Sequence, residues 1–184
     1  LNLNHALAAQ YATIRLGGHG YATGASVLKA GVNTSISKLE HNNTAALITG
    51  EGTTLTITGD SSSYGGSFGG TVTVDYTGGG TFTLGNSDKT VALTPAASAD
   101  ATLKISSGTL SLFSGNVNWS QKLVMGDGTT LTVQDGPAVT GYYNYDAASI
   151  NGDGFTFSGT TTFGTGVNLT TQYGKNIKFT GVLT

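Results

Sequence analysis

The sequence predicts an all-β protein, and three observations support this class. Short segments alternate strictly between apolar and polar residues from Thr53 onward, as in "TLTITG", "TVTVDY" and "TLTVQDG". Such alternation is typical of a strand that buries one side. Thr, which is β-branched and suits strands, occupies many of the polar positions. Gly, Asn and Asp fill the gaps, where tight turns need them.

The spacing of the apolar anchors favours a parallel β-solenoid within this class. From Leu103 onward the apolar anchors are six to eight residues apart, at Leu103, Leu110, Val117, Leu123 and Leu131. Antiparallel hairpin proteins usually repeat their strands every ~8–12 residues. Wider gaps elsewhere, such as Val74 to Phe82, keep an antiparallel β-sandwich or jelly roll as the alternative. The expected inward side chains are Leu55, Ile57, Val72, Val74, Leu103, Ile105, Leu110, Leu112, Leu131 and Val133.

The first 50 residues are expected to form an N-terminal cap or arm, ahead of a β-rich body over residues 51–184. The stretch "HALAAQYATIRL" suits a short helix that covers one end of the body, although "YATIRL" also suits a strand. A strand there could instead fill the groove of a neighbouring copy.

The glycine-rich stretch over residues 59–85 raises the choice between a linker and a set of corners. Its apolar residues recur too often for a linker, so the glycines are expected at corners between short strands. A phosphate-binding loop is not expected in "GGHGYATG", since the Lys-Ser/Thr pair of such loops is missing.

Composition excludes several classes of function. Only 10% of the residues are charged and the net charge is −2, with no basic stripe for nucleic acid. The chain has no cysteine, which rules out disulfides and thiolate zinc sites. No apolar stretch approaches the ~18 residues of a membrane-spanning helix.

"LTITGDSSSYGGSFGGTVTV", followed by "GGTFTLG", resembles the repeat of autotransporter passenger domains, the pertactin-like right-handed β-helices of Gram-negative bacteria. The likeness covers roughly residues 45–136 and rests on a repeat pattern, without an invariant residue. The resemblance implies a secreted, surface-displayed β-helix that is often an adhesin. It places the protein at the cell surface or outside the cell, with a cell-surface glycan or protein receptor as partner.

Catalysis and metal binding have little support in the sequence. The three histidines, His5, His19 and His41, show no metal-binding spacing. Asp127, Asp135 and Asp153 each precede or lie between glycines, where Asp usually bonds its own backbone in a turn. Calcium binding or the carboxylate pair of a polysaccharide-acting enzyme are the alternatives. We expect no cofactor, no metal and no enzymatic activity.

The segment "GYYNYD" is the candidate ligand-binding site, because three tyrosines so close together cannot all face one side of a strand. Its members are Tyr142, Tyr143, Asn144, Tyr145 and Asp146. Exposed tyrosines beside Asn and Asp can stack on a sugar and bond its hydroxyls; the alternative is a buried aromatic end cap. Trp119 is expected in the core or at a corner.

The resemblance and the strand pattern together lead to two expected functions. The first is a surface-displayed or secreted adhesin that attaches to cells or surfaces. The second is a structural subunit of an extracellular filament, such as a strand-exchange pilus, or of a phage fibre or coat, which would self-associate through strand edges.

Overall fold

A computed structural model describes residues 1–16, 26–41, 46–84, 98–113, 117–134, 154–171 and 176–184. Within these residues the chain forms strands and turns, and no segment is helical. Every pairing between two described strands is parallel. The all-β prediction is therefore confirmed, and the described strands contain none of the antiparallel pairs that a sandwich requires.

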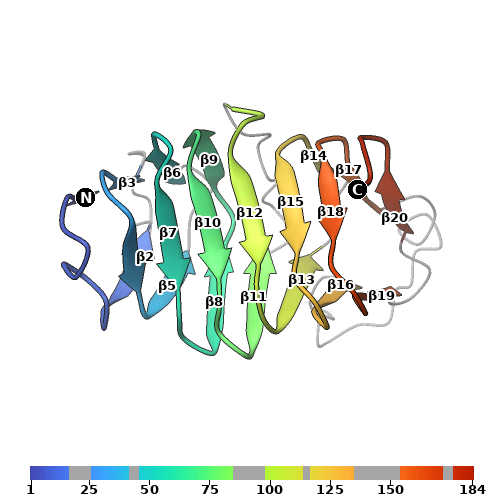
Figure 1. The fold of residues 1–184 in the computed structure, drawn as a ribbon, viewed down its shortest axis with the longest axis horizontal. Coiled ribbons are helices and arrows are strands. Elements are labelled where there is room, and N and C mark those ends of the chain that lie inside the picture. Colours follow the sequence, from blue (N-terminus) through green and yellow to red (C-terminus); the bar gives the residue numbers. More distant parts are fainter. Residues whose placement is uncertain (17–25, 42–45, 85–97, 114–116, 135–153, 172–175) are drawn as a thin grey trace, which may run out of the picture.

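The strands form five parallel sheets, which we group into a first, a second and a third face (Figure 1). The first and third faces each combine two of these sheets. The first face contains β1 (Asn2–Leu3), β3 (Ser26–Ala30), β6 (Ala46–Gly50), β9 (Ser67–Gly70), β14 (Val117–Trp119), β17 (Gly154–Phe157) and β20 (Asn176–Phe179). The second face contains β4 (Thr34–Ile36), β7 (Thr54–Ile57), β10 (Thr73–Tyr76), β12 (Thr102–Ile105), β15 (Lys122–Met125) and β18 (Thr161–Phe163). The third face contains β2 (Thr13–Leu16), β5 (Lys38–His41), β8 (Ser61–Tyr64), β11 (Thr81–Leu84), β13 (Thr109–Phe113), β16 (Thr130–Gln134) and β19 (Asn168–Thr171).

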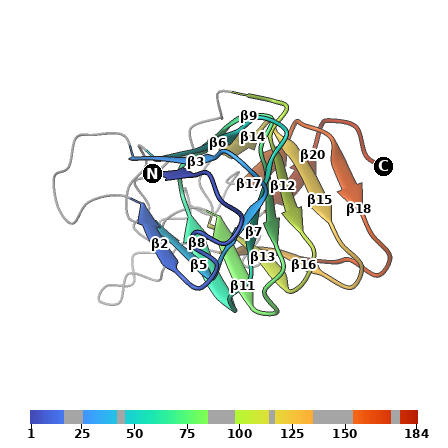
Figure 2. The same ribbon diagram turned by 60° about the vertical axis from the view of Figure 1, so that its left-hand side comes forward.

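From β3 onward the described strands follow the order first, second and third face, apart from the step from β11 to β12 across residues 85–97, and we call each such passage a circuit. β6, β7 and β8 form one circuit, and the next strand, β9, returns to the first face to pair with β6. Seen toward the N-terminal end, the faces surround a shared interior (Figure 2). Each stretch of residues that the structure does not describe follows a strand of the third face. The strands before and after such a stretch pair in parallel with strands of neighbouring circuits. This connectivity is consistent with the expected β-solenoid.

Pairing also crosses the expected boundary at residue 50. β4 pairs with β7, and β6 pairs with β9. The helix expected in "HALAAQYATIRL" is wrong. Residues 5–11 form turns, and Thr13–Leu16 is β2, which pairs in parallel with β5. The alternative interpretation of "YATIRL" as a strand is thus confirmed, because pairing with a neighbouring strand outweighs the weak helical preference.

The core is made of columns in which one circuit's side chain lies against the same position of the next. On the second face, Leu55 aligns with Val74, Leu103 and Leu123, and all four are fully buried. Of the expected inward side chains, all but Val133 are buried, and the Val133 side chain lies outside the described residues. The aromatic residues join this core: Phe68 packs edge-to-face on Trp119, which confirms the core position expected for Trp119.

Glycines occupy the corner between the second and third faces, as expected. Gly108 has a φ of +80°, a conformation that side chains strongly disfavour. A Cβ atom there would also press on the carbonyl oxygen of Gly80, one circuit earlier, and a Cβ on Gly80 would press on that of Asp60. Gly80 and Gly108 therefore leave no room for a side chain, because successive circuits approach each other there through their backbones.

Replacing a core residue should destabilise the protein strongly. We expect Leu110→Ala or Ile105→Ala to lower the free energy of unfolding by about 2–5 kcal/mol, since each removes a fully buried side chain. Thr109→Ala, on the outward side of the same strand, should change it by about 0.5 kcal/mol or less. Urea denaturation measures all three, and neutral core substitutions would contradict the inward assignment.

The glycine corner gives a second prediction with a matched control. Gly108→Ala should cost about 1–3 kcal/mol, because it adds both a disfavoured φ and a clash. Gly79 lies at the same corner with open space around its Cβ position and no positive φ, so Gly79→Ala should be tolerated. Thermal unfolding of both variants checks this, and equal melting temperatures would refute the steric account.

Candidate binding surface

The outward side of five strands on the third face carries two columns of small polar residues, which we call the hydroxyl face. The leading column holds the first residue of each strand: Ser61, Thr81, Thr109, Thr130 and Asn168. The trailing column holds the residue two positions later: Ser63, Thr83, Ser111, Thr132 and Thr170. None of these residues is charged. Their neighbours in sequence, such as Phe82 and Leu110, are fully buried and point inward.

The backbone sets the spacing of this array. Neighbouring strands lie about 4.8 Å apart, and residues two positions apart on a strand are separated by about 6.6 Å, twice the rise of about 3.3 Å. Branching at Cβ restricts the χ1 angle of the threonines in such a strand. The result is a regularly spaced array of small polar side chains.

The two columns differ in exposure. Along the leading column Ser61 and Asn168 are exposed and the three threonines between them are partly exposed. In the trailing column Ser111 is 1% exposed and Thr132 is 9% exposed. The leading column is thus the continuous part of the face that a ligand can reach.

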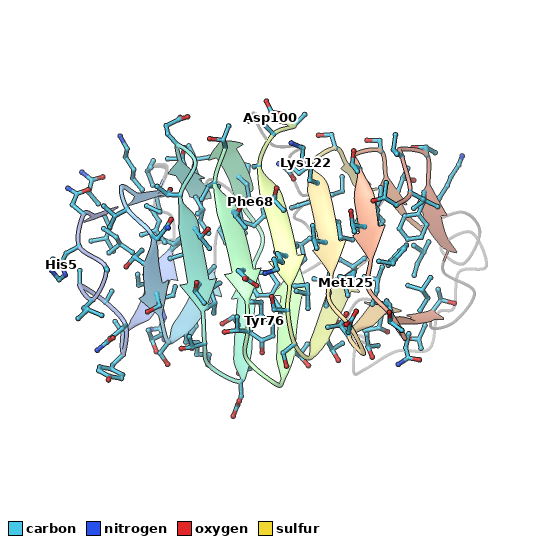
Figure 3. The ribbon with its side chains drawn as sticks, viewed as in Figure 1. His5, Phe68, Tyr76, Asp100, Lys122 and Met125 are labelled. Carbon is cyan, nitrogen blue, oxygen red and sulfur yellow. The ribbon has the colours of Figure 1, made fainter. Side chains whose placement is uncertain are left out.

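The second face has a different character, because charged residues interrupt its outward side. Lys104 Nζ lies 2.9 Å from Asp75 Oδ2, and Ser106 Oγ donates a hydrogen bond of 2.6 Å to the other carboxylate oxygen. Lys122 and Asp100 lie close together at the rim of the molecule, 3.6 Å apart (Figure 3). Of these two faces, the third alone offers an uncharged array over five consecutive strands.

A cluster of charges lies at the N-terminal end of the third face, on β2 and β5. Glu40 accepts a hydrogen bond from Arg15 Nε at 3.0 Å, and its other oxygen lies 2.8 Å from Lys38 Nζ. Hydrogen bonds from Lys38 and then Arg15 lower the pKa of the Glu40 carboxyl below its usual value. The hydroxyl face therefore begins beside an ion-pair cluster and continues without charge.

The aromatic site expected from the sequence, Tyr142, Tyr143, Asn144, Tyr145 and Asp146, lies outside the described residues. Asp135, Asp153 and His19 also lie outside them. The His41 side chain is likewise not described.

Asp127 does occupy a turn, but its carboxylate does not bond its own turn. Its Oδ1 accepts a hydrogen bond of 2.7 Å from the backbone N–H of Thr165, on the next circuit. Asp127 thus fastens two circuits together, and the local turn bond expected for it is wrong.

His5, at the N-terminal end in Figure 3, accepts a local hydrogen bond from the backbone N–H of Leu7 through Nδ1, at 3.2 Å.

The hydroxyl face was not predicted as a site, although the sequence carries its signal. Each strand begins with a pair of small polar residues on either side of one inward position: "SSS", "TFT", "TLS", "TLT" and "NLT". The outward threonines are evident from alternation. Their alignment into columns depends on which strands pair. Alternation does not reveal the pairing, because the number of residues between paired strands varies.

The described residues hold no group of three His, Cys, Asp or Glu side chains that could bind a metal ion. The described part of the chain also has no helix long and apolar enough to cross a membrane. Comparison with known proteins finds no family model, no curated protein and no solved structure that matches this chain.

The charge cluster predicts a depressed pKa that can be measured. The Glu40 carboxyl should titrate below its usual pKa of 4.5, so any stabilisation by the cluster is present above that pH and is lost as the pH falls through the lower value. In a Lys38→Met variant the titration midpoint should rise, because the largest cause of the shift is removed. NMR titration of the Glu40 carboxyl carbon measures both midpoints, and an unchanged midpoint would contradict the assignment.

Proposed function

We propose that the chain is a parallel β-helix, displayed at a bacterial cell surface or secreted, that acts as an adhesin through its hydroxyl face. The visits of successive strands to three faces and the in-register columns support the β-helix. The right-handed sense and the extracellular location come from the resemblance to autotransporter passenger domains. The hydroxyl face is the observation that carries the adhesive role.

The chemistry of this face favours a neutral, hydroxyl-rich partner such as a cell-surface glycan. Thr and Ser hydroxyls both donate and accept hydrogen bonds, so they complement the hydroxyl groups of a sugar. The strands hold them in place before binding, which lowers the entropy lost on association. Each contact is weak, but an elongated polymer lying along the leading column can make several contacts at once.

Attachment fits the described residues better than catalysis. Glycoside hydrolysis usually needs two carboxyl groups on either side of the scissile bond. The hydroxyl face carries no carboxyl group, and on the second face Asp75 is already paired with Lys104. We therefore propose a binding protein and not an enzyme.

A filament or fibre subunit is the second candidate. It is favoured by the stacked parallel strands, because a sheet such as the second face finishes in an outermost strand at each end. Such an end can associate with another chain through its strand edges.

The adhesive proposal predicts that charge on the hydroxyl face weakens attachment. Thr81→Lys combined with Thr130→Lys should weaken binding about tenfold or more, equivalent to ~1.4 kcal/mol, because two bulky cations interrupt the leading column. Thr54→Lys with Thr102→Lys places the same changes in the leading column of the second face and should leave binding intact. Binding of labelled protein to whole cells and to immobilised neutral glycans gives the readout.

Circular dichroism spectra of both double variants establish that the fold is retained. Equal binding by the wild-type chain and the hydroxyl-face variant would refute the proposal. An equal loss in the two double variants would show that the effect is one of charge alone and would refute it as well.

A further inference from the structure

One corner of the described core contains polar side chains that the protein itself does not satisfy. Elsewhere in the core a buried polar group has a partner: Ser62 Oγ accepts a hydrogen bond of 3.1 Å from the backbone N–H of Leu39. In contrast, Trp119 Nε1, both polar atoms of the Gln121 amide and Thr161 Oγ1 are buried without a hydrogen-bond partner in the described structure. These three residues need an explanation that Ser62 does not.

The three residues belong to the corner between the first and second faces. β14 ends at Trp119 and β15 begins at Lys122, so Gln121 lies in the turn between them. Thr161 begins β18 on the neighbouring circuit and aligns with Leu123, two residues beyond Gln121. The remaining buried residue with an unpaired side-chain atom, Ser111, lies apart from this corner, on the outward side of the third face.

Gln121 and Thr161 interrupt two columns of the core that are otherwise apolar. Gln121 occupies the position that Val72 and Ala101 hold on earlier circuits, and both of these residues are fully buried. Thr161 continues the column of Leu123. Two neighbouring columns thus change from apolar to polar side chains at the same place.

Glycines follow Gln121 in its own column. A Cβ atom on Gly159 would press on the backbone carbonyl oxygen of Gln121, and a Cβ atom on Gly181 would press on that of Gly159. The glycines therefore stack closely on Gln121 and offer no side chain that could bond its amide.

The unpaired groups complement one another as ligands of a small polar molecule. Nearly all buried polar groups in proteins bond either the protein or ordered water, because a buried group without a partner has lost its hydrogen bonds to solvent. Trp119 offers an N–H donor, Gln121 offers two donors and an acceptor, and the Thr161 hydroxyl can do both. A buried water makes about three hydrogen bonds, and these side chains supply that many partners.

The surroundings favour water over an ion. Across the described residues, the buried polar side chains are Ser, Thr and Gln, and none of them is charged. A buried ion would need a charged partner, whereas water needs only neutral donors and acceptors.

We propose that this corner of the core binds ordered water, held by the Gln121 amide between the indole N–H of Trp119 and the hydroxyl group of Thr161. The water links the end of the first face to the start of the second face on two successive circuits. It also fixes the indole ring of Trp119, which packs edge-to-face on Phe68. This inference is independent of the adhesive role.

NMR of the intact chain tests the proposal directly. The chain has one tryptophan, so the indole N–H of Trp119 gives a single, readily assigned signal. This signal should show a nuclear Overhauser cross-peak at the water frequency, with the sign of a long-lived contact.

Two near-isosteric variants separate the contributions of the side chains. Gln121→Met keeps the length of the side chain and removes its amide, so the cross-peak should be lost. Thr161→Val removes the hydroxyl group alone and should weaken the cross-peak. Thr102→Val is the matched control, because Thr102 is on the outward side of the same face and should leave the cross-peak unchanged.

Several results would overturn the proposal. These are the absence of the cross-peak in the wild-type chain, an undiminished cross-peak in Gln121→Met, or an equal loss in Thr102→Val. A cross-peak that Thr161→Val removes and Gln121→Met retains would come from the Thr161 hydroxyl itself, and this would also overturn it.

A crystal structure of the wild-type chain gives a second, independent measurement. Ordered water should lie within about 3.2 Å of Trp119 Nε1 and of the Gln121 side chain. Circular dichroism spectra show whether each variant is folded. If Gln121→Met is unfolded, the wild-type cross-peak and the crystallographic water decide, and a dry corner would refute the proposal.

Discussion

The structure depends on one constraint, the in-register parallel pairing of each strand with the strand one circuit away. Side chains alternate between the two sides of a strand, so a shift of one residue would exchange the buried and the exposed sets. With the register kept, Leu55, Val74, Leu103 and Leu123 form one buried column. The same register places Thr81, Thr109 and Thr130 in the leading column on the outside. The core and the hydroxyl face are therefore two products of a single pairing pattern.

Much of the fold follows from local sequence, because the features that predict it are local. Alternation identifies strands such as Thr102–Ile105 and their inward side chains, and glycine identifies the corners. The prediction of a helix near the N-terminus is wrong because the structure there depends on a contact with a distant part of the chain. Ala- and Leu-rich sequence suits a helix or a strand. It forms strand β2 because it pairs with β5, 25 residues further along the chain. A single-sequence pattern does not contain that contact.

The candidate surface was harder to predict because it is a property of aligned circuits. Val74 and Leu103 are neighbours in one column although 29 residues separate them, whereas Leu103 and Leu123 are 20 residues apart. Unless these separations along the sequence are known, the threonine pairs can be recognised only as outward residues of separate strands. Asp127 makes the same point, since its partner Thr165 lies 38 residues away. The tyrosine-rich segment lies outside the described residues, so its proposed role in binding remains a prediction.

The number of residues between a strand of the third face and the next strand of the first face varies along the chain. The segments joining these faces range from residues 114–116 to residues 135–153, yet the described strands on either side hold the same parallel register. The glycine corner, in contrast, admits no added atom at Gly80 or Gly108. The length of sequence between these two faces can therefore differ from one circuit to the next while the described strands keep their pairing. Such a scaffold separates the part that must be copied faithfully from the part that is free to vary, which suits it to carrying interchangeable epitopes.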